Sequence, residues 1–426
     1  MQRFIVTRDA LAGFARLAAT LAASLVLAGC GLKSIMVQTE RLDAASTIEG
    51  KVIAAAGVSL QDLLVVLLRQ DEGGVVLYRA MAPTPDGSFS IVVPDGRFYA
   101  GAFEDRNHDG QYQPSEPAQF YGKPTLLKVK PREREKVQIA VTATSKPVGI
   151  IIPDTAPRVA QVGANMGVVA SLADDRFDPA NGQLGMWKPI DFLAGPQGGL
   201  FLLSPYDPQR IPVLFVHGIA GTPRDFKRTI ARLDHAKYQP WVAYYPSGLR
   251  LDMVANGIAS GMHQIQRRYG FRQYAVVAHS MGGLVARAYI QKVWEQYPEQ
   301  AKALRMFVTV NTPLGGMSSA AYAVENSPLV IPSWQDVAAG SPFLAELGHK
   351  AWHSDVPYYL VFSFEGDDNG DGVVALSSQL AQPFQDQARR TYGFQNTHVG
   401  TLSDLRFTTL LNKLLDNTFP PRFGRK

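Results

Sequence analysis

The sequence predicts two folded regions, an all-β sandwich followed by an α/β region with a mostly parallel sheet and flanking helices. From Thr47 to about Ala143, short apolar runs alternate with Gly-rich and Pro-Asp-Gly turns and show no helical period, which is typical of a β-sandwich. From Ile211 onwards, strand patterns alternate with helical patterns, which indicates a parallel sheet with crossover helices. A chain of 426 residues, 46% of them hydrophobic, is long enough for two or three domains with buried cores.

Residues 1–29 are predicted to be a lipoprotein signal peptide. Three arginines precede an apolar run over 17–28, and this run is shorter than the roughly 20 residues that span a bilayer. The run ends in Leu-Ala-Gly-Cys at Cys30, the only cysteine of the chain. This ending resembles a bacterial lipobox, which implies that Cys30 is lipidated and anchors the protein in the cell envelope. Gly31 at the next position implies the outer membrane. The alternative is a plain secretory signal with a chance cysteine.

Residues 30–45 are predicted to form a polar tether, and residues 46–145 the β-sandwich. The expected strands are separated by turn signals such as Asp-Glu-Gly-Gly over 71–74. Their rhythm resembles the transthyretin-like, carboxypeptidase-regulatory type of domain found in bacterial surface proteins. The predicted strands are 47–53, 63–68, 75–78, 88–93, 97–103 and 137–142.

A candidate metal loop lies within the sandwich, over residues 105–116. It matches the pattern D-x-[DN]-x-[DN]-G-x₅-E. Oxygen ligands at these spacings, with Gly at the sixth position, suit a hard cation, so the sequence predicts a structural Ca²⁺ site. The alternative is a polar hairpin without metal. The predicted ligands are Asp105, Asn107, Asp109, Gln111 and Glu116.

Residues 146–205 are punctuated by seven prolines and are predicted to be a connector that wraps the following domain. We expect one helix over 162–173 and one strand over 200–203 in this segment. Residues 206–426 then form the α/β domain. Its expected strands are 212–216, 241–245, 274–278, 305–311 and 357–362, and its expected helices are 225–233, 251–269, 284–297 and 403–417.

The charge balance gives no reason to expect a nucleic-acid partner. The net charge is +5 and falls to +3 when residues 1–29 are removed. Basic residues are scattered, apart from 128–136, where acidic residues are interleaved, as on a solvated strand edge. The sequence gives no indication of the oligomeric state.

Residues 276–287, Val-Val-Ala-His-Ser-Met-Gly-Gly-Leu-Val-Ala-Arg, read as an apolar strand, a tight turn holding Ser280, and a helix that opens on small residues. This arrangement resembles the nucleophile elbow G-x-S-x-G of α/β hydrolases. The turn crowds the strand against the helix, and Gly282 and Gly283 supply the small residues after the serine. Ala278 stands where the pattern prefers glycine, as in several groups of lipases.

A serine nucleophile needs a base, and the base needs an acid that orients it. In this fold the chain order is Ser, Asp or Glu, then His. His398 is the only histidine downstream of the candidate acids, so it is the predicted base. Asp371 opens an Asp-Gly-Val-Val stretch that resembles the surroundings of the triad acid in bacterial lipases, which favours it over Asp368 and Asp367. These residues make Ser280, His398 and Asp371 the predicted triad.

Two backbone N–H groups must face the negative charge that develops on the substrate oxygen. The elbow supplies the N–H of Met281. The His-Gly-Ile-Ala-Gly segment at 217–221 resembles the H-G-x-x-G loop of lipases, which implies the N–H of Ile219 as the second donor. His217 is then a structural residue that braces the loop, and His279 packs or hydrogen-bonds locally.

Together these motifs resemble bacterial α/β-hydrolase lipases and esterases. The resemblance implies a lipid-anchored serine hydrolase that cleaves carboxylic esters of small molecules or lipids through an acyl-enzyme and needs no cofactor for catalysis. Residues 313–350 are rich in bulky apolar side chains and form a candidate lid for a fatty acyl chain, with ordinary helical packing as the alternative. Other open hypotheses are an acyltransferase, thioesterase or peptidase with the same triad, and a non-catalytic surface-binding lipoprotein.

Overall fold

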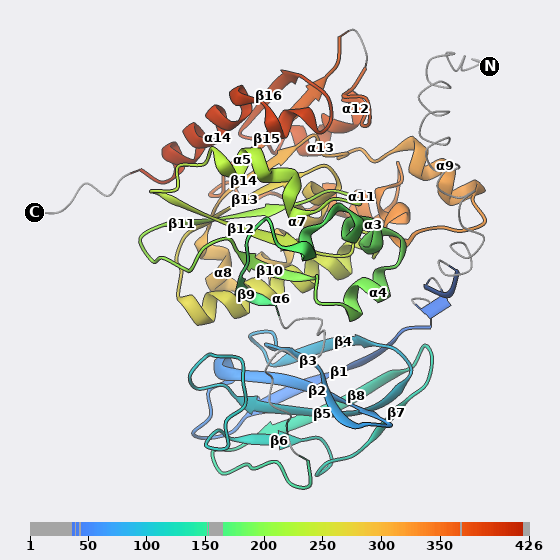
Figure 1. The fold of residues 1–426 in the computed structure, drawn as a ribbon, viewed down its shortest axis with the longest axis vertical. Coiled ribbons are helices and arrows are strands. Elements are labelled where there is room, and N and C mark those ends of the chain that lie inside the picture. Colours follow the sequence, from blue (N-terminus) through green and yellow to red (C-terminus); the bar gives the residue numbers. More distant parts are fainter. Residues whose placement is uncertain are drawn as a thin grey trace, which may run out of the picture.

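The structure, a computed structural model, separates the chain into a β-sandwich and a larger α/β domain (Figure 1). The predicted signal peptide, the lipidation site Cys30 and the alternative acids Asp367 and Asp368 lie outside the described residues. In the part of the chain that is described, no helix is both long and apolar enough to cross a bilayer. The structure describes residues 36–38, 40–41, 44–150, 152, 165–366 and 369–420.

The β-sandwich consists of a three-stranded sheet in the order β4-β1-β8 and a five-stranded sheet in the order β3-β2-β5-β6, with β7 paired to β5. All pairs are antiparallel except β1 with β8. A short 3₁₀ helix, η1, precedes β2. The bounds are β1 Ser46–Ala54, η1 Leu60–Asp62, β2 Leu63–Asp71, β3 Gly74–Met81, β4 Ser88–Val93, β5 Gly96–Glu104, β6 Ala118–Phe120, β7 Leu127–Val129 and β8 Arg134–Val141.

Strand β2 is buried on both faces over residues 63–68. Successive side chains of a strand point to opposite faces. Leu63, Val65 and Leu67 accordingly pack in the core between the sheets. Leu64 packs instead in a second cluster on the outer face, which Ile152 helps to cover. The unbroken apolar run in the sequence therefore reflects a central strand with two packed faces.

The α/β domain has one eight-stranded sheet in the order β16-β15-β14-β13-β11-β12-β10-β9. The pairing of β10 with β12 is antiparallel, and all other neighbours are parallel. This is the α/β-hydrolase fold, as the sequence predicts. The bounds are β9 Met166–Val169, β10 Gly199–Leu202, β11 Ile211–Val216, β12 Tyr238–Tyr244, β13 Tyr274–His279, β14 Leu304–Val310, β15 Tyr358–Phe364 and β16 Arg390–Gln395.

Helices cover both faces of this sheet (Figure 1). Helices α6 and α7 pack in one core cluster, and α5 and α14 pack in the other. The bounds are η2 Asp175–Phe177, α3 Pro179–Trp187, α4 Pro189–Ala194, η3 Pro223–Phe226, α5 Lys227–Ala231, α6 Leu251–Tyr269, α7 Met281–Gln296, α8 Pro298–Ala303, α9 Ser318–Asn326, α10 Pro332–Val337, α11 Pro342–His349, α12 Leu376–Gln379, α13 Gln382–Gln385, η4 Gly400–Ser403 and α14 Leu405–Thr418.

The predicted connector contributes two strands, β9 and β10, to this sheet. The expectation of one helix over 162–173 is wrong, because residues 166–169 form strand β9 beside β10. The pair Val168-Val169 favours a strand, and Gly167, at φ +75°, takes a conformation that disfavours a helix. Tertiary pairing therefore decides the structure of this short apolar segment.

Part of the predicted tether is docked on the α/β domain. The side chain of Gln38 is buried. Its Nε2 donates to Asp191 Oδ1 of α4 at 2.8 Å, and its Oε1 accepts from the N–H of Ile190 at 3.0 Å. The chain just before the sandwich is thus fixed to the connector helices.

An ion pair joins the sandwich to the α/β domain. Arg267 of α6 donates to Asp62, at the end of η1, with an N–O distance of 3.2 Å. His108 Nε2 lies 3.8 Å from the same carboxylate. The candidate metal loop therefore lies close to the contact between the two domains.

Candidate active site

Strand β13 ends at His279 and the chain turns sharply at Ser280 into helix α7. Ser280 has φ 54° and ψ −136°, a strained conformation for a residue with a side chain. Its N–H donates to Val310 O at 2.8 Å, and its carbonyl accepts from Gly283 N at 2.9 Å. A Cβ on Gly282 would overlap the carbonyl of His217. The elbow therefore requires small residues after the serine, as its sequence pattern indicates.

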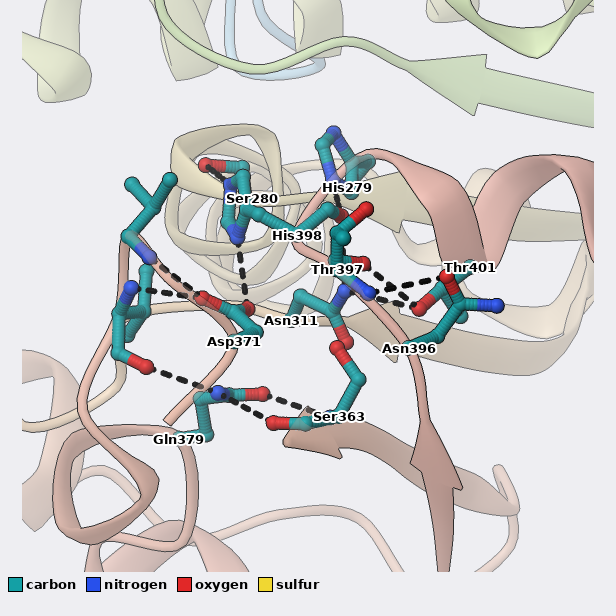
Figure 2. Close-up of polar contacts among 12 residues, drawn as sticks. His279, Ser280, Asn311, Ser363, Asp371, Gln379, Asn396, Thr397, His398 and Thr401 are labelled. Carbon is teal, nitrogen blue, oxygen red and sulfur yellow. Dashed lines mark hydrogen bonds and ion pairs between the residues drawn. The ribbon is translucent and has the colours of Figure 1, made fainter. Parts of the chain in front are cut away.

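The structure brings the three predicted triad residues together (Figure 2). His398 Nε2 lies 2.9 Å from Ser280 Oγ, and His398 Nδ1 lies 2.7 Å from Asp371 Oδ2. Because the carboxylate can only accept, Nδ1 carries the proton and the lone pair of Nε2 faces the serine hydroxyl. The side chain of Asp371 is fully buried and that of His398 is 9% exposed. The arrangement can remove the serine proton in a nearly water-free site.

Backbone donors hold the carboxylate of Asp371. Its Oδ1 accepts from the N–H groups of Val373 and Val374 at 3.0 and 2.7 Å. Gln379, a buried residue that sequence reasoning missed, donates to the carbonyl groups of Val374 and Ser363 at 3.0 Å each. This amide ties the acid loop to strand β15, as Figure 2 shows.

The backbone carbonyl of His398 has two side-chain donors. His279 Nε2 lies 3.0 Å from it, and Asn311 Nδ2 lies 2.8 Å from it. Burial and the neighbouring His398 lower the pKa of His279 to about 3, so this imidazole is neutral and its Nε2 carries the proton that it donates. His279 therefore forms a hydrogen bond, as predicted, and this bond holds the backbone of His398. Asn311 has φ +51° and follows β14 directly, which is the signal that could have identified it.

The loop after β11 lies against the elbow. A Cβ on Gly218 would come within 2.8 Å of Ser280 Cβ. His217 Nδ1 lies 2.8 Å from Gly218 O, and Tyr245 Oη donates to His217 O at 2.5 Å. Burial lowers the pKa of His217 to about 4, so it is a neutral brace for the loop, in the structural role that the sequence predicts.

The two predicted oxyanion donors lie on either side of this contact. Ile219 follows Gly218, and Met281 follows Ser280. Within the described chain, neither backbone N–H has a protein acceptor. A buried N–H without a partner is rare in proteins, and Met281 itself is buried. A developing oxyanion requires two donors of this kind, and the assignment of Ile219 and Met281 to this role stays a prediction.

The candidate lid over 313–350 forms three helices, α9, α10 and α11. Helix α9 has no buried residue, and its Tyr322 is 56% exposed. Helix α10 is anchored, because Asp336 Oδ2 accepts from the N–H of Leu251 at 2.7 Å. Trp334 of α10 packs edge-on against Trp187 of α3, with 6.0 Å between the rings. The connector and the lid segment therefore meet.

Three exposed apolar side chains directly adjoin the site residues. Ile219 is 38% exposed, Val373 is 53% exposed and Val399 is 57% exposed. They belong to the loops that carry the predicted oxyanion donor, the predicted acid and the predicted base, respectively. We call these three residues the apolar rim.

The candidate metal loop over 105–116 directs its carboxylates towards backbone donors. Asp105 accepts from the N–H groups of Asp109 and Gly110 at 3.1 and 3.0 Å, and Glu116 from those of Arg106 and Gln113 at 2.8 and 2.9 Å. Burial raises the pKa of Asp105 and of Glu116. Among the described residues, no group of three or more His, Cys, Asp or Glu side chains could hold a metal ion. The Ca²⁺ site stays a prediction.

Comparisons with known proteins agree with the fold. The family model described as "Alpha/beta hydrolase of unknown function (DUF915)" matches residues 250–389, a range that contains Ser280 and Asp371 and ends before His398. No curated protein sequence matches the chain.

Several solved structures are similar to about half of this chain. Lipase BlEst2 from Bacillus licheniformis, in its mature form, is 16% identical, with 50% of this chain and 97% of that chain covered and a TM-score of 0.42. Lipase B from Aspergillus fumigatus is also 16% identical, with 51% and 56% covered and a TM-score of 0.41. An esterase from Pyrococcus furiosus is 14% identical, with 49% and 82% covered and a TM-score of 0.36.

Proposed function

We propose that this α/β hydrolase is a serine esterase or lipase that cleaves carboxylic esters. The observation that carries the proposal is the continuous chain from Ser280 Oγ to His398 Nε2 at 2.9 Å and from His398 Nδ1 to Asp371 Oδ2 at 2.7 Å. In this arrangement a general base activates the hydroxyl, and a buried carboxylate stabilises the resulting imidazolium.

The proposed reaction has two halves. Ser280 Oγ attacks the ester carbonyl while His398 Nε2 takes the hydroxyl proton, and the N–H groups of Ile219 and Met281 donate to the oxyanion. The intermediate collapses to an acyl-enzyme as His398 gives the proton to the leaving alcohol. His398 then takes a proton from a water molecule that attacks the acyl-enzyme. The second intermediate collapses, His398 returns the proton to Ser280 Oγ, and the free acid leaves.

We further propose that the substrate is an ester with an apolar acyl group. The apolar rim of Ile219, Val373 and Val399 supports this substrate class, since each exposes an apolar side chain on a loop that carries a predicted site residue. A lipid anchor at Cys30 in a bacterial envelope, as the sequence predicts, would hold the enzyme beside such substrates.

Labelling by a fluorophosphonate tests the nucleophile, the base and the oxyanion donors together. We expect the purified full chain in detergent to form one covalent adduct at Ser280, mapped by mass spectrometry, and to hydrolyse p-nitrophenyl esters. The Ser280→Ala variant should lose both properties, while Ser319→Ala, a serine of α9 outside the triad, keeps them. An unlabelled chain that hydrolyses neither short nor long acyl esters would disprove the proposal.

A further inference from the structure

A polar pocket of about 450 Å³ lies at the edge of the α/β sheet opposite to the triad. Arg305 is the second residue of β14, Arg390 is the first residue of β16, and Arg389 precedes it. Tyr359, near the start of β15, lies between them because it pairs with Arg390 in the sheet register. All three arginines and Tyr359 line the pocket.

The pocket is separate from the catalytic site. Strands β13 to β16 are parallel, so their amino ends share one edge of the sheet and their carboxyl ends the other. The triad residues follow carboxyl ends, whereas the arginines stand at amino ends. Strand β14 has seven residues, and a rise of about 3.3 Å per residue separates its two ends by roughly 20 Å.

The three arginines concentrate positive charge, and none of them forms an ion pair with a described residue. Within the described part of the chain, Arg305, Arg389 and Arg390 form no ion pair, although Arg210, Arg250 and Arg406 each do. The pocket has a single acidic lining residue, Asp355, which also makes no ion pair there. Neighbouring strands are about 4.8 Å apart, so the backbones of β14 and β16 lie roughly 10 Å apart on either side of β15. Arginine side chains from both strands can thus reach one small anion between them.

We propose that this pocket binds a phosphoryl group. Guanidinium groups bind phosphate oxygens through paired N–H donors and stay charged at any physiological pH. Tyr359 and Tyr392 line the same pocket, and a tyrosine hydroxyl can donate to a phosphate oxygen as well. The lining is mainly polar and offers little surface to an acyl chain, so the charged head of the ligand is what is recognised. The phosphoryl group belongs either to a free phosphorylated solute or to a phospholipid headgroup.

Calorimetric titration of the purified full chain with inorganic phosphate and with pyrophosphate, in chloride buffer, tests this site. The variant replaces all three arginines by glutamine (Arg305→Gln, Arg389→Gln and Arg390→Gln). The control makes the same charge change at three exposed basic residues elsewhere (Arg97→Gln, Lys128→Gln and Arg228→Gln). We expect pyrophosphate to bind more tightly than phosphate, and the triple variant to lose affinity at least tenfold. The control should keep its affinity within twofold.

A second arm identifies the source of the phosphoryl group. Vesicles of phosphatidylcholine with and without phosphatidic acid are floated with each protein. Flotation on phosphatidic-acid vesicles that exceeds flotation on phosphatidylcholine alone, and does so only with the three arginines present, assigns the site to a headgroup. Phosphate binding without this excess assigns it to a free solute. The proposal is overturned if neither phosphate nor pyrophosphate binds, or if the triple variant and the control bind them with equal affinity. Esterase activity is unchanged in either variant, so failure here is independent of the proposed function.

Discussion

At the residue scale, the site depends on how His398, the proposed base, is held. His398 is fixed at four points: its Nδ1 at Asp371, its carbonyl oxygen at His279 and at Asn311, and its backbone N–H. Its own N–H donates to Asp371 O at 2.9 Å. Because the ring and the backbone are both restrained, Nε2 faces Ser280 with little conformational freedom left to lose during the reaction.

Replacing Asp371 by asparagine tests the role of the acid. The amide group of the new side chain donates where the carboxylate accepts, so His398 takes the tautomer with the proton on Nε2 and cannot accept the serine proton. We expect kcat for p-nitrophenyl esters to fall by about 10⁴-fold, with a melting temperature close to that of the wild type. Nearly unchanged kcat would place the acid elsewhere in the loop, at Asp367 or Asp368.

The buried histidine His279 makes stability depend on pH. Its pKa is about 3 in the folded protein, against 6.5 for a free histidine. A base with a lowered folded pKa contributes stability that is complete above pH 6.5 and is lost as the pH falls towards 3. In His279→Gln this contribution is absent, so the stability advantage of the wild type should shrink by about 1.4 kcal/mol per pH unit below 6.5.

Denaturant unfolding between pH 5 and pH 8 measures this difference. His349→Gln, which changes an exposed histidine of α11, serves as the control and should not alter the pH slope. A slope in His279→Gln equal to that of the wild type would mean that His279 is protonated as readily in the folded protein as in the unfolded chain.

At the element scale, the loops that follow the strands carry the site, and the strands align them. Ser280 follows β13, Asn311 follows β14 and Asp371 lies beyond β15. Parallel neighbours bring these three carboxyl ends to one edge of the sheet. Gly282 permits the helix after the serine to approach the loop after β11, which brings the backbone of Ile219 near the nucleophile.

The Ca²⁺ site of the loop over 105–116 also belongs to this scale, and it stays a prediction. The pattern predicts Ca²⁺ ligands. In the structure, the carboxylates of Asp105 and Glu116 accept hydrogen bonds from backbone N–H groups of the same loop. If Ca²⁺ binds, its charge removes the burial cost of both carboxylates. At 100 times its Kd, Ca²⁺ should then stabilise the folded chain by about 2.7 kcal/mol.

Thermal unfolding of the full chain after EDTA treatment, with and without added Ca²⁺, measures this stabilisation. Asp105→Asn should abolish the response, because position 1 of the loop, where the pattern requires Asp, then loses its charge. Asp86→Asn, in a turn of the same sandwich, should keep it. An EDTA-treated chain that does not respond to Ca²⁺ would identify the loop as a hairpin without metal.

At the scale of the whole molecule, the sequence predicts the domains and the long elements better than the short strands at the ends of the sheet. Long periodic elements were predictable: helix α6 has the predicted bounds, 251–269. Short strands whose pairing is decided by distant partners, such as β9 and β16, were not. The predicted triad could be chosen from the sequence because this fold fixes the order of the nucleophile, the acid and the base along the chain. Gln379 bonds to backbone atoms of distant segments, so only the folded chain reveals its position, whereas Asn311 could have been identified from its place directly after β14.

The contact between the two domains determines whether they unfold together. Arg267 of α6 has a side chain that is only 13% exposed. Burial lowers the pKa of the Arg267 guanidinium below its usual value, and the Asp62 carboxylate offsets only part of this effect. Asp62→Ala would leave this cation at the interface without its partner. Because the pair is neither fully buried nor fully exposed, the expected cost lies between the two limits, at about 1–2 kcal/mol.

Scanning calorimetry of Asp62→Ala should show a lower first melting temperature and a wider separation between the melting of the sandwich and that of the hydrolase. The control is Asp71→Ala, since Asp71 pairs with Arg69 of the same strand at 2.9 Å and its loss affects the sandwich alone, by less than about 0.5 kcal/mol. Equal effects of the two variants would show that the ion pair does not couple the domains. A larger effect of Asp62→Ala means that the sandwich stabilises α6, which packs in the same core cluster as the elbow helix α7.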